Sequence, residues 1–263
     1  MEELSAPERS SPNTPNPATG RPPQLEFAMG IALFAIILMV FMLVQFTVLV
    51  HGVVQRDPAF AQQGFSLALL QDSTFKDAMN RNLFNGDLVA LEALWSGLIG
   101  TIVILVSVFL WKRREASAFL GLRLPTIKQF GLWLGVFLLL AGALEVLMRS
   151  APAFQTDFME KVLGSSTSTL LLVVGVGLMA PLFEEFLLRG LLFGTARHIV
   201  DEHASVAITA GVFTVMHLQY DVLVMLLILP LGIVLGYARS RSGSLWVPFV
   251  LHALNNLASV LLN

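Results

Sequence analysis

Phe27–Val50 reads FAMGIALFAIILMVFMLVQFTVLV and contains no charged side chain. A helix needs roughly 20 predominantly apolar residues to cross about 30 Å of hydrocarbon, and this run is longer than that. The stretch therefore predicts a membrane-spanning helix, and the rest of the chain is interpreted outward from it.

The composition agrees with a membrane protein. The chain has 263 residues, of which 56% are hydrophobic and 13% are charged, whereas soluble domains are about 45–50% apolar and about 25% charged. A net charge of -2 leaves no basic surface for holding nucleic acid. The absence of cysteine excludes disulfides, thiol catalysis and thiolate metal sites.

Six further apolar runs follow the first one. They lie at about Leu88–Trp111, Gln129–Met148, from Thr169 onward, Ser205–Leu218, Val222–Tyr237 and Leu245–Leu262. The sequence therefore predicts an all-α, polytopic transmembrane helical bundle of about seven spans. Residues 1–25 are rich in proline and poor in large apolar side chains, which predicts a disordered tail.

Basic residues suggest how the chain is oriented. Five of them lie between the second and third predicted spans, namely Lys112, Arg113, Arg114, Arg123 and Lys128. Cytoplasmic loops carry an excess of lysine and arginine, so this side is expected to be cytoplasmic, and the N-terminus with it. We expect a multi-pass protein of the plasma (inner) membrane of a prokaryote.

Polar side chains inside membrane spans are costly, so they usually line a cavity or pair with one another. Three apolar runs carry such groups in the segments FEEFLLRG, FTVMH and HALNN. The residues are Glu184, Glu185 and Arg189; Phe213 and His217; and His252, Asn255 and Asn256. Because water cannot easily satisfy these groups, we expect them to meet inside the bundle.

Helical periodicity separates the acidic groups. Glu185 and Arg189 are four residues apart and share a helix face, so they are predicted to pair. Glu184 points about 100° away from Glu185 and remains as a free carboxylate.

The same periodicity applies to the last run. His252 and Asn256 lie one turn apart and can present two hydrogen-bond donors to one point. Asn255 is three residues from His252 and is the alternative donor.

A carboxylate, a neighbouring histidine and a second histidine with an amide are suited to hydrolysis of an acyl bond. The base removes a proton from water, and donors stabilise the oxyanion as it forms. No serine, threonine or cysteine stands out beside these residues, which favours direct attack by water. A zinc site made by Glu184, His217 and His252 is the chemical alternative, and buried polar contacts that only connect helices are the structural one.

In this arrangement the chain resembles the CPBP (CAAX protease and bacteriocin-processing, or Abi) family of intramembrane proteases, which includes the type II CAAX prenyl endopeptidases. The family motifs E-E-x-x-x-R, F-x-x-x-H and H-x-x-x-N or D correspond in order to EEFLLR, FTVMH and HALNN. Each motif is weak alone, but three in order on separate apolar runs make a specific match.

The resemblance implies roles for these residues. Glu184 would activate water with His217 as its partner, and His252 with Asn256 would form the oxyanion site. The supporting residues would be Glu185, Arg189 and Phe213.

The composition and apolar runs, together with the resemblance over about Thr169–Leu262, predict a division of the chain. Residues 1–25 are expected to form a disordered cytoplasmic tail, 26–166 an N-terminal membrane region with three spans and a polar loop after the first span, and 167–263 the catalytic membrane core. We expect no cofactor, with zinc as the alternative because the family has been described in both ways.

The expected function is an intramembrane endopeptidase. Its partners would be the lipid bilayer and a membrane-associated peptide or protein, either prenylated at a CAAX end or a precursor peptide. A non-catalytic membrane protein, such as a bacteriocin immunity factor or a scaffold, is the alternative. A transporter is less favoured because no inverted repeats are present.

Overall fold

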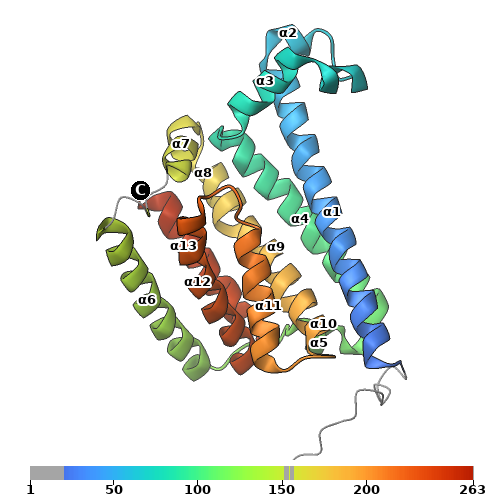
Figure 1. Cartoon of the computed structure of the whole chain (residues 1–263), viewed down its shortest axis with the longest axis vertical. Coiled ribbons are helices and arrows are strands. Elements are labelled where there is room, and N and C mark those ends of the chain that lie inside the picture. Colours follow the sequence, from blue (N-terminus) through green and yellow to red (C-terminus); the bar gives the residue numbers. More distant parts are fainter. Residues whose placement is uncertain (1–20, 151–153, 155–156, 263) are drawn as a thin grey trace, which may run out of the picture.

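The computed structural model describes residues 21–150, 154 and 157–262, and within these residues it contains helices and no strands (Figure 1). Five helical segments are long and apolar enough to cross a membrane. They are α1 (Pro23–Arg56), Gly86–Leu120, α6 (Ile127–Ser150), Thr169–Ala196 and α12 (Val222–Ser242). The predicted all-α membrane fold is confirmed, and the protein is an integral membrane protein.

The predicted count of about seven spans is not confirmed. Helices occur at all seven predicted places, but two of them are short: α11 (Glu202–Val215) has 14 residues and α13 (Trp246–Leu261) has 16. Both are shorter than the roughly 20 residues that a crossing requires.

Two of the long segments are composite. Gly86–Leu120 and Thr169–Ala196 each contain several helical pieces that are contiguous in sequence, and in the first the backbone turns at Arg113, whose φ is 50°. The first contains α4 (Gly86–Lys112), η2 (Arg113–Glu115) and α5 (Ala116–Leu120). The second contains α8 (Thr169–Leu172), η4 (Val173–Met179), α9 (Ala180–Glu185), η5 (Phe186–Leu192) and α10 (Phe193–Ala196).

Short helices cover the ends of the long ones. They are α2 (Pro58–Ala61), η1 (Leu67–Gln71), α3 (Ser73–Asn82) and α7 (Phe158–Ser165). Phe60 and Phe75 pack edge to face at 5.1 Å within a small apolar cluster that also includes Val53 and Leu88. The segment predicted as a polar loop therefore has an apolar core of its own.

The predicted tail lies mostly in residues 1–20, which are outside the described part. Residues 23–25 belong to α1, so this helix begins earlier than predicted.

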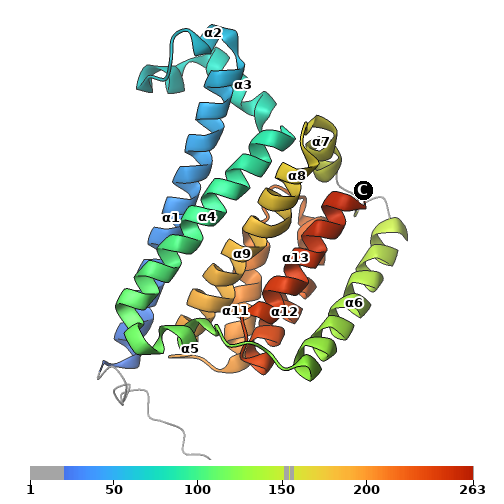
Figure 2. The same ribbon diagram turned by 180° about the vertical axis from the view of Figure 1, so that it is seen from behind.

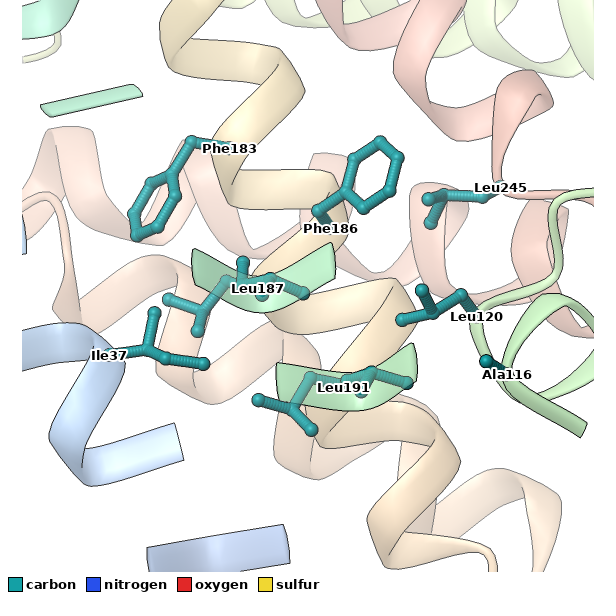
Figure 3. Close-up of a cluster of buried hydrophobic side chains, with 10 residues drawn as sticks. Ile37, Ala116, Leu120, Phe183, Phe186, Leu187, Leu191 and Leu245 are labelled. Atoms are coloured by element: carbon teal, nitrogen blue, oxygen red, sulfur yellow. The ribbon is translucent and has the colours of Figure 1, made fainter. Parts of the chain in front are cut away.

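Figures 1 and 2 show α1 and α4 side by side on one flank, α6 on the opposite flank, and the C-terminal helices between them. The Thr169–Ala196 segment is the most buried of the five long segments. In Figure 3 its side chains Phe183, Phe186, Leu187 and Leu191 pack among residues of other helices. Those neighbours include Ile37 of α1, Leu120 of α5 and Leu245 just before α13. The segment that carries the two glutamates is thus the central helix of the bundle.

Close backbone contact joins α4 to η4. A Cβ atom at Gly175 would lie 2.2 Å from the Ala90 carbonyl oxygen, and one at Gly97 would lie 2.7 Å from that of Met179. Only glycine permits such an approach, because any side chain would overlap the facing backbone. α4 therefore fixes the position of the Thr169–Ala196 segment. This segment carries the EEFLLR motif and is called the motif helix below.

Candidate active site

The helix that carries the glutamates departs from α-helical geometry on both sides of them. The stretches η4 and η5 are π-helical, and α9 with Glu184 and Glu185 lies between them. In a π-helix an N–H group bonds to the carbonyl five residues earlier, as the N–H of Ala180 does to Gly175. Such widened turns are frequent at functional sites.

Pro181 explains how Asn256 is held. A proline has no N–H group, so it cannot donate to the carbonyl of Val176 five residues earlier. The side-chain Nδ2 of Asn256 donates to this oxygen instead, at 3.0 Å. An amide nitrogen has two hydrogens, so Asn256 keeps a second donor for another partner.

Glu185 is bonded through one of its two carboxylate oxygens, and its Oε2 is buried without a hydrogen-bond partner in the described part of the chain. Its Oε1 accepts from Nη1 of Arg189 at 2.9 Å and from Nδ1 of His252 at 2.9 Å. Both glutamate and arginine side chains are completely buried. Arg189 also donates from Nη2 to the carbonyl of Gly232 at 3.0 Å. The predicted pair between Glu185 and Arg189 is present, and His252 joins it, which the sequence did not predict.

The bond to Glu185 also orients the imidazole of His252. Because Nδ1 donates to a carboxylate, the second ring nitrogen, Nε2, faces away from Glu185. It lies 3.9 Å from Oε2 of Glu184, which is beyond hydrogen-bond length. His252 therefore stands between the two adjacent glutamates.

Glu184 differs from Glu185 in both exposure and partners. Its side chain is 14% exposed, and its Oε2 atom is buried without a hydrogen-bond partner among the described residues. Buried polar atoms usually have such a partner. In the described part of the chain, Oε2 of Glu185 lacks one as well, so the two carboxylates differ because Oε1 of Glu185 is bonded to Arg189 and His252 while Glu184 has no such bond. This is the free carboxylate that helical periodicity predicts.

Phe213 packs at the centre of the group. Its ring contacts the imidazole of His217 at 4.7 Å and that of His252 at 5.2 Å. The guanidinium carbon of Arg189 lies 4.7 Å from the centre of the same ring, a cation–π contact.

His217 lies in the turn just after α11 ends at Val215. Its Nδ1 is 2.8 Å from the carbonyl of Phe213, so this nitrogen carries the proton and Nε2 is left as an acceptor. At 1.5 Å per residue α11 is about 21 Å long, which ends it inside the bundle. Within the described residues the structure gives no hydrogen bond or ion pair between His217 and Glu184.

Tyr220 is a member of this group that the sequence did not predict. Its ring stacks on His217 at 6.2 Å with an interplanar angle of 13°, and packs edge to face on Phe158 at 5.1 Å. Burial, and then the negative charge of Glu184, raise the pKa of Tyr220 to about 12. The sequence places Tyr220 only three residues after His217, which could have suggested a contact. Tyr220 lies beyond Leu218, where the predicted span ends, and was therefore not predicted.

Asn255, the alternative donor, takes a different position from Asn256. The backbone carbonyl of Asn255 accepts a hydrogen bond from the hydroxyl of Ser259 at 3.2 Å. Of the two amides, Asn256 is the one bonded to the motif helix.

The zinc alternative can be compared with this geometry. The described residues contain no group of three histidine, cysteine or acidic side chains gathered closely enough to hold a metal ion. A zinc site needs three or four ligands at about 2.0–2.3 Å from one point. As arranged, Glu184, His217 and His252 do not form such a site.

Comparison with known proteins covers the region that contains this site. Residues 166–258 match the family described as "Type II CAAX prenyl endopeptidase Rce1-like". This match confirms the family resemblance predicted from the three motifs, over about a third of the chain. No curated protein and no solved structure gives a significant match.

Proposed function

We propose that the protein is an intramembrane endopeptidase in which Glu184 activates a water molecule. The observation that carries this proposal is that the two adjacent glutamates differ in their partners and in their exposure. Glu185 is fully buried and is paired through Oε1 with Arg189 and His252, whereas Glu184 is 14% exposed and, among the described residues, has only a 3.9 Å contact with Nε2 of His252. The match to a prenyl endopeptidase family supports the same activity.

The chemical steps follow from the positions of the donors and acceptors. Glu184 takes a proton from water, the resulting hydroxide attacks the peptide carbonyl carbon, and the carbonyl oxygen becomes an oxyanion. Nε2 of His217, left as an acceptor, helps to orient that water. The protonated Glu184 then gives its proton to the leaving nitrogen as the C–N bond breaks.

The oxyanion is stabilised by His252 and Asn256. Asn256 uses the second hydrogen of its amide, since the first is held by Val176. Nδ1 of His252 is used by Glu185, so the ring presents its other nitrogen, Nε2, to the oxyanion. Fixed donors of this kind are worth about 100- to 1000-fold in rate.

We propose that catalysis needs no metal. The support is that Glu184, His217 and His252 are not gathered around one point in the described part of the chain. Cleavage that persists after thorough chelation is the expected result. Loss of cleavage on chelation, with recovery on adding zinc, would replace this mechanism by the metal-dependent one.

The proposed substrate is a membrane-associated peptide or protein, prenylated at a CAAX end or cut from a precursor. The family description supports the first type. The site lies between helices of a membrane bundle, which favours a substrate already held at the bilayer. We assign catalysis to residues 167–263 and support of that core to residues 26–166.

We further propose a prokaryotic plasma (inner) membrane location with the N-terminus in the cytoplasm. The beginning of α1, the end of α4 and the beginning of α6 lie toward one end of the molecule (Figure 1). The five basic residues between the second and third predicted spans also lie there, as the positive-inside rule expects.

A non-catalytic role remains the second candidate, because the same polar contacts connect helices. His252 ties α13 to α9, and Asn256 ties α13 to η4. An immunity factor or scaffold would need these contacts for folding alone.

The test begins with the substrate. Peptides from cells that carry the wild-type protein are compared with those from cells that carry Glu184→Gln, and the terminal fragments missing in the variant identify candidates. Cleavage of a synthetic candidate is then measured with purified wild-type protein, Glu184→Gln and His217→Ala. Glu145→Gln is the control, because Glu145 is an exposed carboxylate paired with Arg149 on α6.

The enzyme proposal predicts that Glu184→Gln and His217→Ala lose cleavage while Glu145→Gln keeps it. Full cleavage by either Glu184→Gln or His217→Ala would contradict the proposed mechanism. A wild-type phenotype in cells that carry either variant at normal protein level favours the non-catalytic role.

A further inference from the structure

A groove lies on the flank of the molecule where α1 begins and α4 ends, away from the group around Glu184. It has a volume of about 490 Å³. Its walls include Met29 and Leu33 of α1 and Leu110 and Trp111 of α4. Leu110 is 73% exposed, so the walls are apolar surface that the protein itself leaves uncovered.

Two arginines stand at the polar end of this groove. Arg21 precedes α1 and Arg113 follows α4, and both line it. Arg21 contacts the carboxylate of Glu26 at 3.7 Å. A guanidinium has five N–H donors, so this contact is compatible with a further acidic ligand.

A buried ion pair holds the two helices together next to the groove. Nζ of Lys112 pairs with Oε2 of Glu26, and both side chains are almost completely buried. The same Nζ lies 4.0 Å from the centre of the Trp111 ring, which fixes the indole as one wall. Lys112 is therefore part of the support of the groove.

The local charge is positive. Arg21 and Arg113 of the groove, with the adjacent pair of Lys112 and Glu26, are three cationic side chains and one carboxylate, which leaves a net charge of +2. Basic pockets between membrane helices at the membrane surface bind anionic lipid head groups.

From the helix ends inward, the groove presents cationic and then apolar side chains. A phospholipid presents its phosphate and its acyl chains in the matching order. Arg21 lies just before the start of α1, Met29 lies about 9 Å along the helix from Pro23, and Leu33 is one turn beyond Met29. The cationic end thus lies at the helix ends, where head groups are found, and the apolar walls continue toward the hydrocarbon.

We infer that this groove binds one anionic phospholipid. Arg21 and Arg113 hold its phosphate, and an acyl chain lies along Met29, Leu33 and Leu110. A soluble peptide fits less well, since the apolar walls face the region that lipid occupies in a membrane.

The test uses Trp111 as a reporter. A variant that keeps Trp111 as its sole tryptophan carries Trp95→Phe, Trp133→Phe and Trp246→Phe. It is reconstituted into phosphatidylcholine vesicles that contain a small fraction of brominated phosphatidylglycerol or of brominated phosphatidylcholine. The fluorescence quenching of Trp111 is then compared between the two.

Brominated phosphatidylglycerol is expected to quench at least about twofold more than brominated phosphatidylcholine at equal fraction, because the anionic lipid is concentrated in the groove. Arg21→Gln/Arg113→Gln should remove the difference. Arg114→Gln, which changes an exposed arginine outside the groove, should retain it. Equal quenching by both lipids, or a difference that survives in the double variant, overturns the inference.

Native mass spectrometry provides a second test with all four tryptophans present. One phosphatidylglycerol should stay bound to the wild-type protein and to Arg114→Gln, and be lost from the double variant. Inorganic phosphate should not displace it, since the acyl chain contributes to binding. Displacement by phosphate alone, or equal retention in all three proteins, contradicts a lipid site.

Discussion

Two adjacent glutamates differ here because a helix turns about 100° per residue. Glu185 is directed into a buried network with Arg189 and His252, and Glu184 is directed toward the edge of it. The same geometry sets the effect of each substitution. Changes at Glu185 or Arg189 act on stability, whereas changes at Glu184 act on the proposed chemistry.

Arg189→Met should lower the free energy of unfolding by about 3 kcal/mol, because it leaves the buried Glu185 charge without its arginine. Denaturant titration in mixed micelles measures this change. The matched control is Arg149→Met, whose arginine is 80% exposed in its pair with Glu145 and should cost at most about 1 kcal/mol. Equal effects of the two substitutions would show that the buried pair has no special weight.

Tyr220 gives a prediction about pH. Its pKa is raised from 10.0 to about 12, so the hydroxyl keeps its proton in the folded protein at a pH where an ordinary tyrosine ionises. The tyrosinate absorbance of wild type minus that of Tyr220→Phe should therefore rise near pH 12. Between these two pH values the folded state binds more protons than the unfolded state, so stability falls as pH rises. A difference titration centred near 10.0 would contradict the burial of this hydroxyl.

The geometry of the candidate site depends on departures from regular α-helix. Two π-helical stretches flank α9, and α11 ends inside the bundle with His217 in the turn beyond it. A proline in the central helix is accommodated because Asn256 takes the place of the missing backbone donor. The role of Pro181 is thus to leave one carbonyl available to a side chain.

Pro181→Ala should lower the cleavage rate by about tenfold, since a backbone N–H at this position competes with Asn256 for the Val176 carbonyl. The melting temperature should stay the same or rise, because a helix-breaking residue is removed. Pro230→Ala is the matched control, as Pro230 also lies inside a helix, α12, away from this contact. An unchanged rate in Pro181→Ala would show that the carbonyl of Val176 does not position Asn256.

At the scale of the whole molecule, the N-terminal helices hold the motif helix through close backbone contact. Gly175→Ala should therefore destabilise the protein by about 2 kcal/mol, because the added methyl group meets the Ala90 carbonyl. Gly131→Ala is the control: it lies in α6 with nothing within 4 Å of the added atom, and should not destabilise. Thermal unfolding of both variants in detergent checks this, and similar melting temperatures would count against the interface.

Much of this arrangement can be predicted from the sequence because it follows from simple periodicity. The charge-free run Phe27–Val50 indicates a span, and the spacing of Glu185 and Arg189 indicates their pair. The link between His252 and Glu185 could not be predicted, since it joins residues 67 positions apart. The π-helical stretches could not be predicted either, because their residues are as apolar as those of an ordinary α-helical span.

We propose that Glu184 performs chemistry and that Glu185 supports structure. The most direct measurement compares Glu184→Gln and Glu185→Gln for both cleavage rate and melting temperature, with the same purified protein and substrate. Glu184→Gln is predicted to lose about 1000-fold in cleavage rate with an unchanged melting temperature, while Glu185→Gln lowers the melting temperature. Wild-type cleavage by a folded Glu184→Gln protein would contradict a catalytic role for Glu184.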